Sequence, residues 1–135
     1  MNGRFHISVH ILTLLDAAKG ELVSSDYLAG SINTNPALVR KELSNLRKHG
    51  LIISKEGKAG GYMLAKSPDQ IRFADVYEAV KQTAILGQAR NEPNPKCPVG
   101  RQINQHLKDM DKEIEDAVIK KLYDFNLADF SEKFY

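Results

Sequence analysis

Hydrophobic residues recur at helical spacing near the start of the chain. Phe5, Val9, Leu12 and Leu15 fall three or four positions apart, which predicts an amphipathic helix over about 5–18. A basic residue followed by an apolar run also resembles a secretion signal. Serine, threonine and histidine interrupt that run, so we expect an ordinary helix that packs on a core.

Two shorter helical patterns follow, joined by a polar turn. Ser24 or Ser25 can cap a helix of about 26–31, and Asn35 can cap another over about 36–49, with proline as its first residue. A glycine after the second pattern is a favourable stop. Two short helices joined by a tight polar turn predict a helix-turn-helix.

The next segment alternates short apolar runs with a glycine-rich loop. Residues 51–54 and 62–65 are apolar and partly β-branched or aromatic, and the basic loop 55–61 joins them. This pattern predicts a β-hairpin. A nucleotide-phosphate loop is disfavoured, because no Gly-Lys-Ser/Thr ending and no helix follow. A hairpin directly after a helix-turn-helix is a wing.

The last third predicts one long helix after a proline-rich loop. A shorter helix is expected over about 72–83, then a loop at 85–98, then a helix from about 98 to 123 that would be about 37 Å long. Its apolar stripe exceeds what a small head can cover, so we expect a second copy to cover it. The stripe comprises Ile103, Leu107, Met110, Ile114 and Val118.

These elements define the expected fold class and domains. We expect a mainly α protein with a small β-hairpin wing: a winged helix-turn-helix head over 1–84, a loop over 85–98, and a dimerisation helix with its tail over 99–135. The aromatic tail from 125 onward is expected to pack on the other subunit. A long helix packed back on its own domain is the alternative.

The charge pattern points to the head as the binding region. The chain has 19 Lys/Arg and 17 Asp/Glu, a net charge of +2. Residues 36–66 alone hold seven Lys/Arg against two Asp/Glu. A basic segment of this kind is typical of a nucleic-acid-binding surface, although an ordinary solvated surface has the same signature.

The predicted helix 36–49 has two distinct faces. Val39, Leu43 and Leu46 form the inward stripe. The outward face combines small residues with cations, flanked by Arg40 and Arg47. Small residues allow close approach and cations bind phosphates, so this face suits a helix that enters a DNA major groove.

Several of these segments together resemble the Rrf-two family of IscR- and CymR-like winged helix-turn-helix transcription regulators. The resemblance covers nearly the whole chain. Its most specific parts are L-R-K-H-G-L-I at 46–52 and G-K-A-G-G-Y-M-L at 57–64. It implies a homodimer that binds double-stranded DNA at a partly palindromic operator, most simply as a repressor.

The resemblance also implies roles for individual residues. The base-reading or groove-facing candidates are Thr34, Asn35, Ala37, Arg40 and Lys41. The phosphate contacts are expected at Ser24, Ser25 and Lys48, and those of the wing at Lys55, Lys58, Gly60 and Gly61.

One departure from the family concerns its cofactor. Members that bind an iron–sulfur cluster have three cysteines and a histidine around the loop before the long helix, whereas this chain has only Cys97, and Gly100 replaces the histidine. One thiolate does not supply four ligands, so we expect no cluster, no metal and no other cofactor. With Pro98 as first helical residue, Cys97 would cap the long helix beside Lys96, which favours a reactive thiolate. A redox-responsive regulator and a cysteine without a role both remain open.

Other functional classes receive less support. No nucleophile elbow, paired-acid motif or zinc-protease motif is present, so an enzyme is not expected. No apolar stretch is long enough for a membrane span, and a single cysteine favours a reducing compartment, so we expect a cytoplasmic protein with no membrane partner. A winged helix that binds an acidic protein is the remaining alternative, and the effector stays unknown.

Overall fold

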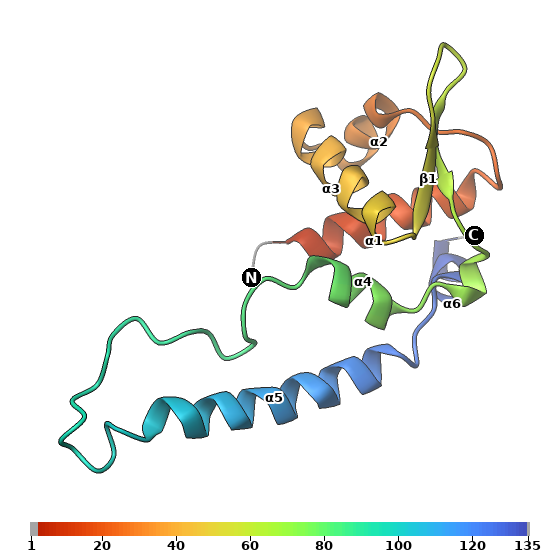
Figure 1. Cartoon of the computed structure of the whole chain (residues 1–135). Helices are drawn as coiled ribbons and strands as arrows, with labels where there is room; N and C mark the ends of the chain where they lie inside the picture. The colour runs from red at the N-terminus through yellow and green to blue at the C-terminus, as the bar shows by residue number, and fades with distance from the viewer. Residues whose placement is uncertain (1–2, 135) are drawn as a thin grey trace. The chain divides into compact units, whose positions relative to one another are not determined.

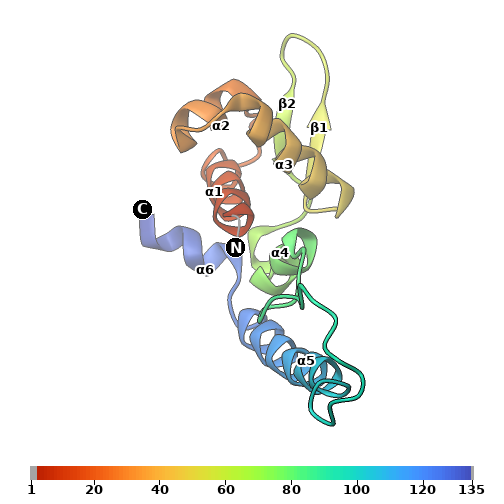
Figure 2. The same ribbon diagram turned by 90° about the vertical axis from the view of Figure 1, so that its left-hand side faces the viewer.

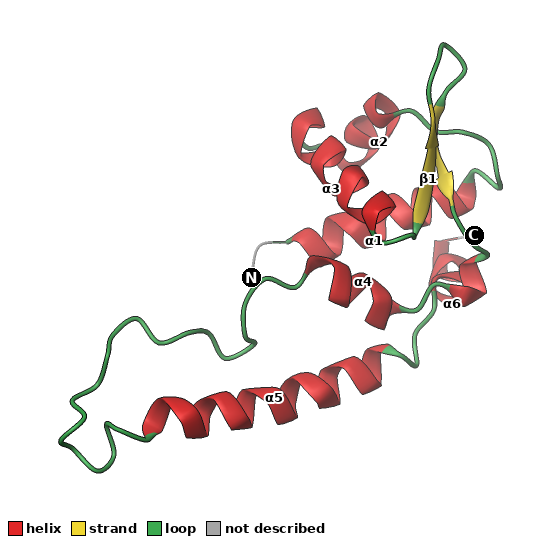
Figure 3. Ribbon diagram, viewed as in Figure 1, coloured by secondary structure: helices red, strands yellow, loops and turns green. Residues whose placement is uncertain are grey.

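The computed structural model describes residues 3–134, which divide into two compact units. Residues up to 81 together with 122–134 form the first unit, here called the head, and residues 82–121 form the second, here called the arm. Helices and strands follow the predicted order (Figures 1 and 3). The elements are α1 (Arg4–Ala17), α2 (Ser25–Ile32), α3 (Pro36–Lys48), β1 (Ile52–Lys55), β2 (Gly61–Leu64), the 3-10 turn η1 (Pro68–Gln70), α4 (Phe73–Val80), α5 (Ile103–Leu122), α6 (Leu127–Ser131) and the 3-10 turn η2 (Glu132–Phe134).

Helix α1 is the centre of the head. It contacts α2, α3, α4, α6 and β2. The turned view shows α2 and α3 on one side of α1, with α4 and α6 on the other (Figure 2). Ile11, Leu12 and Leu15 of α1 are at most 1% exposed, as is Leu28 of α2. Burial of these side chains supplies the main driving force for folding of the head.

The helix-turn-helix forms as predicted. Ser24 caps α2, because its hydroxyl oxygen accepts a hydrogen bond from the Tyr27 N–H at 3.1 Å. Asn35 caps α3 by accepting the Ala37 N–H at 2.8 Å, and Pro36 is the first helical residue. Between the helices, Asn33 adopts a left-handed conformation with φ of 59°. Asparagine tolerates this conformation better than most residues, which permits the tight turn.

The predicted wing is a two-stranded antiparallel hairpin. Ile52 is opposite Leu64 and Lys55 is opposite Gly61. Val23, just before α2, extends this pairing by exchanging two backbone hydrogen bonds with Tyr62, at 2.9 and 2.8 Å. The hairpin is therefore attached to the segment that leads into the helix-turn-helix.

The C-terminal tail packs on the head of its own chain. Leu127 of α6 is fully buried in the head core, and the Phe130 ring contacts Phe73 at 5.2 Å between centroids. The Phe73 N–H also donates to the Phe125 carbonyl at 2.9 Å. The structure therefore groups 122–134 with the head, whereas the predicted domain runs over 99–135. The expected packing of the tail on another subunit stays a prediction.

Two helices are shorter than the sequence predicts. Helix α4 ends at Val80, its last buried residue, because the exposed residues 81–83 have no apolar face to pack. Helix α5 begins at Ile103, five residues later than expected, and residues 98–102 form turns instead. With 20 residues, α5 is about 30 Å long.

The arm consists of α5 and the long loop before it. The loop is attached to the helix by Asp111, whose Oδ1 accepts the Leu86 N–H at 2.6 Å. Asp111 is 8% exposed and is the one residue of α5 classed as buried. The remaining described arm residues are exposed or half-buried.

Candidate nucleic-acid interface

Helix α3 presents its cations outward. Val39, Leu43 and Leu46 are fully buried against the head core, as the predicted stripe requires. Arg40 and Lys41 are exposed on the surface of the helix. The two short helices and the adjacent hairpin give the geometry of a winged helix-turn-helix, in which the second helix reads DNA.

The structure places the predicted base-reading residues on one continuous segment. Thr34 lies in the turn between α2 and α3, Asn35 caps α3, and the other three occupy its first half. Asn35, Ala37, Arg40 and Lys41 are exposed, and Thr34 is half-buried. Their DNA contacts stay a prediction, but all five lie at the end of α3 that a helix-turn-helix directs to base edges.

The predicted phosphate contacts flank this segment. Ser24 is exposed at the start of α2 and Ser25 is half-buried beside it. Lys48 is the last residue of α3 and is exposed. Ser24 accepts a hydrogen bond as a cap, and its hydroxyl keeps a donor that suits a phosphate oxygen.

The wing holds the remaining predicted contacts. Lys55 and Lys58 are exposed, whereas Gly60 and Gly61 are half-buried. A Cβ at Gly61 would lie 2.7 Å from the Val23 carbonyl oxygen, and one at Gly60 would overlap the Lys55 carbonyl. The packing of the hairpin on its own backbone therefore requires both glycines, a reason separate from any close approach to DNA.

Two links that hold α3 in place were not predicted from the sequence. Glu42 is fully buried and pairs with Arg4 of α1, and the Asn45 side-chain NH₂ donates to the Ala79 carbonyl of α4 at 2.8 Å. Glu42 adjoins Leu43 of the inward stripe, and this position on the helical wheel was the available signal. Of the two acidic residues in the basic segment 36–66, Glu42 therefore does not lie on the surface, and its charge is paired with that of Arg4.

Arg47 connects α3 to the wing. Its Nη1 donates to the Ser54 hydroxyl oxygen of β1 at 2.9 Å. The sequence predicts Arg47 as a cation on the flank of the outward face. In the structure, Arg47 also ties α3 to the hairpin beside it.

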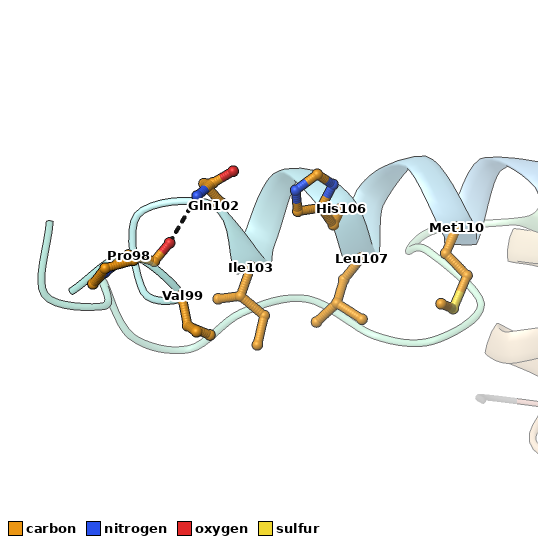
Figure 4. A pocket seen from close by; sticks show the side chains of 7 residues that line it. All are labelled: Pro98, Val99, Gln102, Ile103, His106, Leu107 and Met110. Carbon is orange, nitrogen blue, oxygen red and sulfur yellow. Dashed lines mark hydrogen bonds between the residues drawn. The ribbon is translucent and has the colours of Figure 1, made fainter.

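The predicted dimerisation stripe forms an apolar face on α5. Ile103, Leu107 and Met110 are 38%, 47% and 50% exposed, whereas Ile114 and Val118 are half-buried. Val99, Ile103, Leu107 and Met110 point to one side of the helix start, and Gln102 and His106 lie on another (Figure 4). A shallow hollow of about 310 Å³ follows this face. Apolar side chains in such a row at helical spacing are typical of a helix that packs on a partner.

The structure corrects the predicted environment of Cys97. Because α5 begins at Ile103, Cys97 does not cap the long helix; it lies in an exposed turn, where its carbonyl accepts the Arg101 N–H at 3.0 Å. A Cβ at Gly100 would lie 2.7 Å from the Asn94 carbonyl oxygen, so a histidine there requires a different loop. Across residues 3–134, no three His, Cys, Asp or Glu side chains gather in a way that could hold a metal ion.

A family model described as "Iron-dependent Transcriptional regulator", named Rrf2, matches residues 1–133. The chain belongs to the Rrf2 family. This confirms the resemblance, the winged-helix fold class and the general assignment as a DNA-binding transcriptional regulator. The iron named in this description does not fit the residues of this chain. Cys97 is its single cysteine, and among residues 3–134 it has no neighbouring His, Cys, Asp or Glu side chains that would complete a metal site.

Two similar proteins match nearly the full length of the chain, one in sequence and one in structure. The chain is 36% identical over 129 residues to YwnA of Bacillus subtilis (strain 168), described as a candidate HTH-type transcriptional regulator; the match covers 96% of this chain and 95% of YwnA. A crystal structure of a candidate transcriptional regulator from Lactobacillus plantarum superposes with a TM-score of 0.82 at 27% identity, covering 98% of this chain and 89% of the other.

A third comparison supports the fold alone. The structure of CymR, described as the global cysteine regulator of B. subtilis, has a TM-score of 0.72 at 23% identity, with 100% of this chain and 98% of CymR covered. In the part of this Rrf2 chain that the structure describes, no helix is both long and apolar enough to cross a bilayer.

Proposed function

We propose that this Rrf2 protein represses transcription as a homodimer on a partly palindromic operator, with α3 in the major groove and the β1–β2 wing along the minor groove. The observation that carries the proposal is the division of charge on α3. Arg40 and Lys41 face outward, while the single acid of the helix, Glu42, is turned into the core and paired with Arg4. The outward face therefore offers DNA only cationic and neutral side chains.

The residues of the head divide into two roles under this proposal. Arg40 and Lys41, with Thr34, Asn35 and Ala37, contact base edges, because side chains in the first half of the second helix reach into the groove. Ser24, Ser25, Lys48, Lys55 and Lys58 bind phosphates and fix the register of the protein on the duplex. Gly60 and Gly61 shape the wing that carries the lysines.

The apolar stripe of α5 supports a two-fold dimer. Exposing Leu107 and Met110 to water is unfavourable. If the stripe packs against the same stripe of a second chain, the apolar faces of both α5 helices are buried in one symmetric interface. A two-fold dimer presents two α3 helices to half-sites one or two helical turns of DNA apart. A partly palindromic operator follows from this symmetry.

We propose that the protein works in the cytoplasm without an iron–sulfur cluster or other cofactor. A cluster needs four protein ligands in this kind of loop, and the loop supplies Cys97 alone. One of the two grounds for a redox role of Cys97 is absent, because the cysteine does not lie at the start of α5, and the neighbouring Lys96 is the ground that is left. Occupancy of an operator that overlaps a promoter suffices for repression, since a bound dimer excludes RNA polymerase.

The test is selection of bound sequences from a random duplex pool, repeated at several salt concentrations. We expect an enriched two-fold motif and an affinity that falls steeply with salt, as counterions are released from phosphates. A promoter carrying the motif upstream of a reporter then gives the sign of regulation. A flat salt response with no enriched motif would instead indicate a winged helix that binds an acidic protein.

A further inference from the structure

The base-reading helix contains a carboxylate with no access to solvent. Glu42 is 0% exposed and lies in α3 next to the buried residues Leu43 and Val39. A buried carboxylate is unfavourable unless hydrogen bonds and an opposite charge compensate for its lost hydration. An apolar residue would fill this position without that requirement, so the acid needs a separate explanation.

Two side chains of α1 hold the two oxygens of Glu42 separately. The Arg4 Nε–H donates to Oε1 at 2.9 Å, and the Ser8 hydroxyl donates to Oε2 at 3.3 Å. Arg4 and Ser8 are four residues apart and so share one face of α1. The Arg4 side chain is 16% exposed and Ser8 is fully buried. Because each oxygen has its own donor, the plane of the carboxylate is fixed as well as its position.

A second directional link lies three residues further along α3. The Asn45 side chain donates to the Ala79 carbonyl at 2.8 Å, which joins α3 to α4. Glu42 and Asn45 therefore attach the helix to two different elements of the head. Apolar contacts of Val39, Leu43 and Leu46 are non-directional and tolerate small rotations of a helix, whereas hydrogen bonds to two neighbours do not.

We propose that Glu42, held by Arg4 and Ser8, is a positioning residue that sets the rotation of α3 so that Arg40 and Lys41 meet the base edges. The proposal rests on the proposed reading of bases by α3. Arg40 and Lys41 immediately precede Glu42 in the helix, so any rotation at Glu42 moves both cations. A buried ion pair seldom adds to the stability of a fold. Its better-established role is to select one packing arrangement of neighbouring helices over others.

The test replaces the three residues with apolar ones of similar size: Arg4→Met, Ser8→Ala and Glu42→Leu together. A buried ion pair replaced in this way commonly leaves stability unchanged or raised. We expect the thermal midpoint to be retained and binding to random duplex to stay within about twofold, while the operator-to-random affinity ratio falls about tenfold, the size of one good base contact. An unchanged ratio in the folded triple variant would overturn the proposal.

Two further variants complete the experiment. Glu42→Gln keeps the shape of the side chain but removes the charge that binds Arg4, and we expect it to lower the ratio in the same direction. If the triple variant does not fold, Glu42→Gln alone provides the test. An unchanged operator-to-random ratio in Glu42→Gln would then refute the positioning role. Glu56→Leu is the matched control, because it removes an exposed acid from the wing; we expect both affinities to rise together and the ratio to stay constant. If the wild type itself does not distinguish operator from random DNA, the proposed base reading has failed rather than the role of Glu42.

Discussion

The Leu86 backbone N–H donates to Oδ1 of Asp111 at 2.6 Å, which attaches the long loop of the arm to the middle of α5. Asp111 is 8% exposed although it belongs to a helix whose other residues are more accessible. A hydrogen bond to an ionised acceptor is stronger than a neutral one. The Asp111 side chain therefore ties the loop to the helix.

Replacing Asp111 with alanine should release the loop. We expect the Leu86 amide to exchange with solvent about 10- to 100-fold faster, since a hydrogen bond to a charged group contributes about 1.5–3 kcal/mol. Hydrogen-exchange mass spectrometry of the 82–102 segment measures this change. Asp111→Asn is the matched control, because its carbonyl oxygen still accepts; equal exchange in all three proteins would show that the contact does not hold the loop.

The apolar stripe of α5 makes a prediction about assembly. Leu107→Asp combined with Ile114→Asp places two charges in the proposed interface, and we expect monomers by sedimentation velocity. Gln105→Asp with Lys112→Gln changes the net charge equally on the opposite side of the helix and should leave the dimer intact. A dimer that persists in the first variant would refute the α5 interface.

The wing depends on a close backbone approach at Gly61. Gly61→Ala places a Cβ 2.7 Å from the Val23 carbonyl oxygen, at a φ of +155°, whereas Gly57→Ala at a φ of +108° meets nothing within 4 Å. Both substitutions add backbone strain of about 1–3 kcal/mol, and only the first adds a steric clash. Thermal unfolding should therefore show a larger fall in Tm for Gly61→Ala. Equal falls would mean that the hairpin can shift away from Val23 at no cost.

Cys97 makes a prediction about the cofactor and the redox response. Protein purified without oxygen should contain no stoichiometric iron or sulfide, and Cys97→Ser should bind operator as tightly as the wild type. Treatment with peroxide should leave both affinities unchanged, because the thiol lies in an exposed turn rather than at a helix start. If oxidation abolished operator binding in the wild type but not in Cys97→Ser, this prediction would be wrong and a thiol switch at Cys97 would be supported.

The features predicted correctly from the sequence are those set by local chemistry. The caps at Ser24 and Asn35 and the proline at 36 act on their own or the next few residues, so their effect is visible in the chain itself. The outward placement of Arg40 and Lys41 follows from the inward stripe of the same helix. Each of these inferences required no knowledge of distant segments.

The features that the sequence did not reveal depend on distant partners. Glu42 is paired with a residue 38 positions away, so the local sequence does not reveal this partner, although the place of Glu42 beside the inward stripe was a signal of its burial. The burial of Leu127 in the head is likewise a tertiary contact. The start of α5 was predicted wrongly from the sequence. Pro98 suits a first helical position, but residues around Gly100 form turns and the helix begins only at Ile103.

The central claim is that α3 reads bases while the wing binds phosphates, and paired affinities for operator and random duplex test it directly. Fluorescence anisotropy on Arg40→Ala, Lys41→Ala and Lys55→Ala gives both values for each variant. We expect the two α3 variants to lower the operator-to-random ratio by about 5- to 100-fold, and Lys55→Ala to weaken both affinities equally with a salt slope smaller by about one. Equal losses on both duplexes for all three variants would contradict the account, because α3 would then bind DNA without reading its sequence.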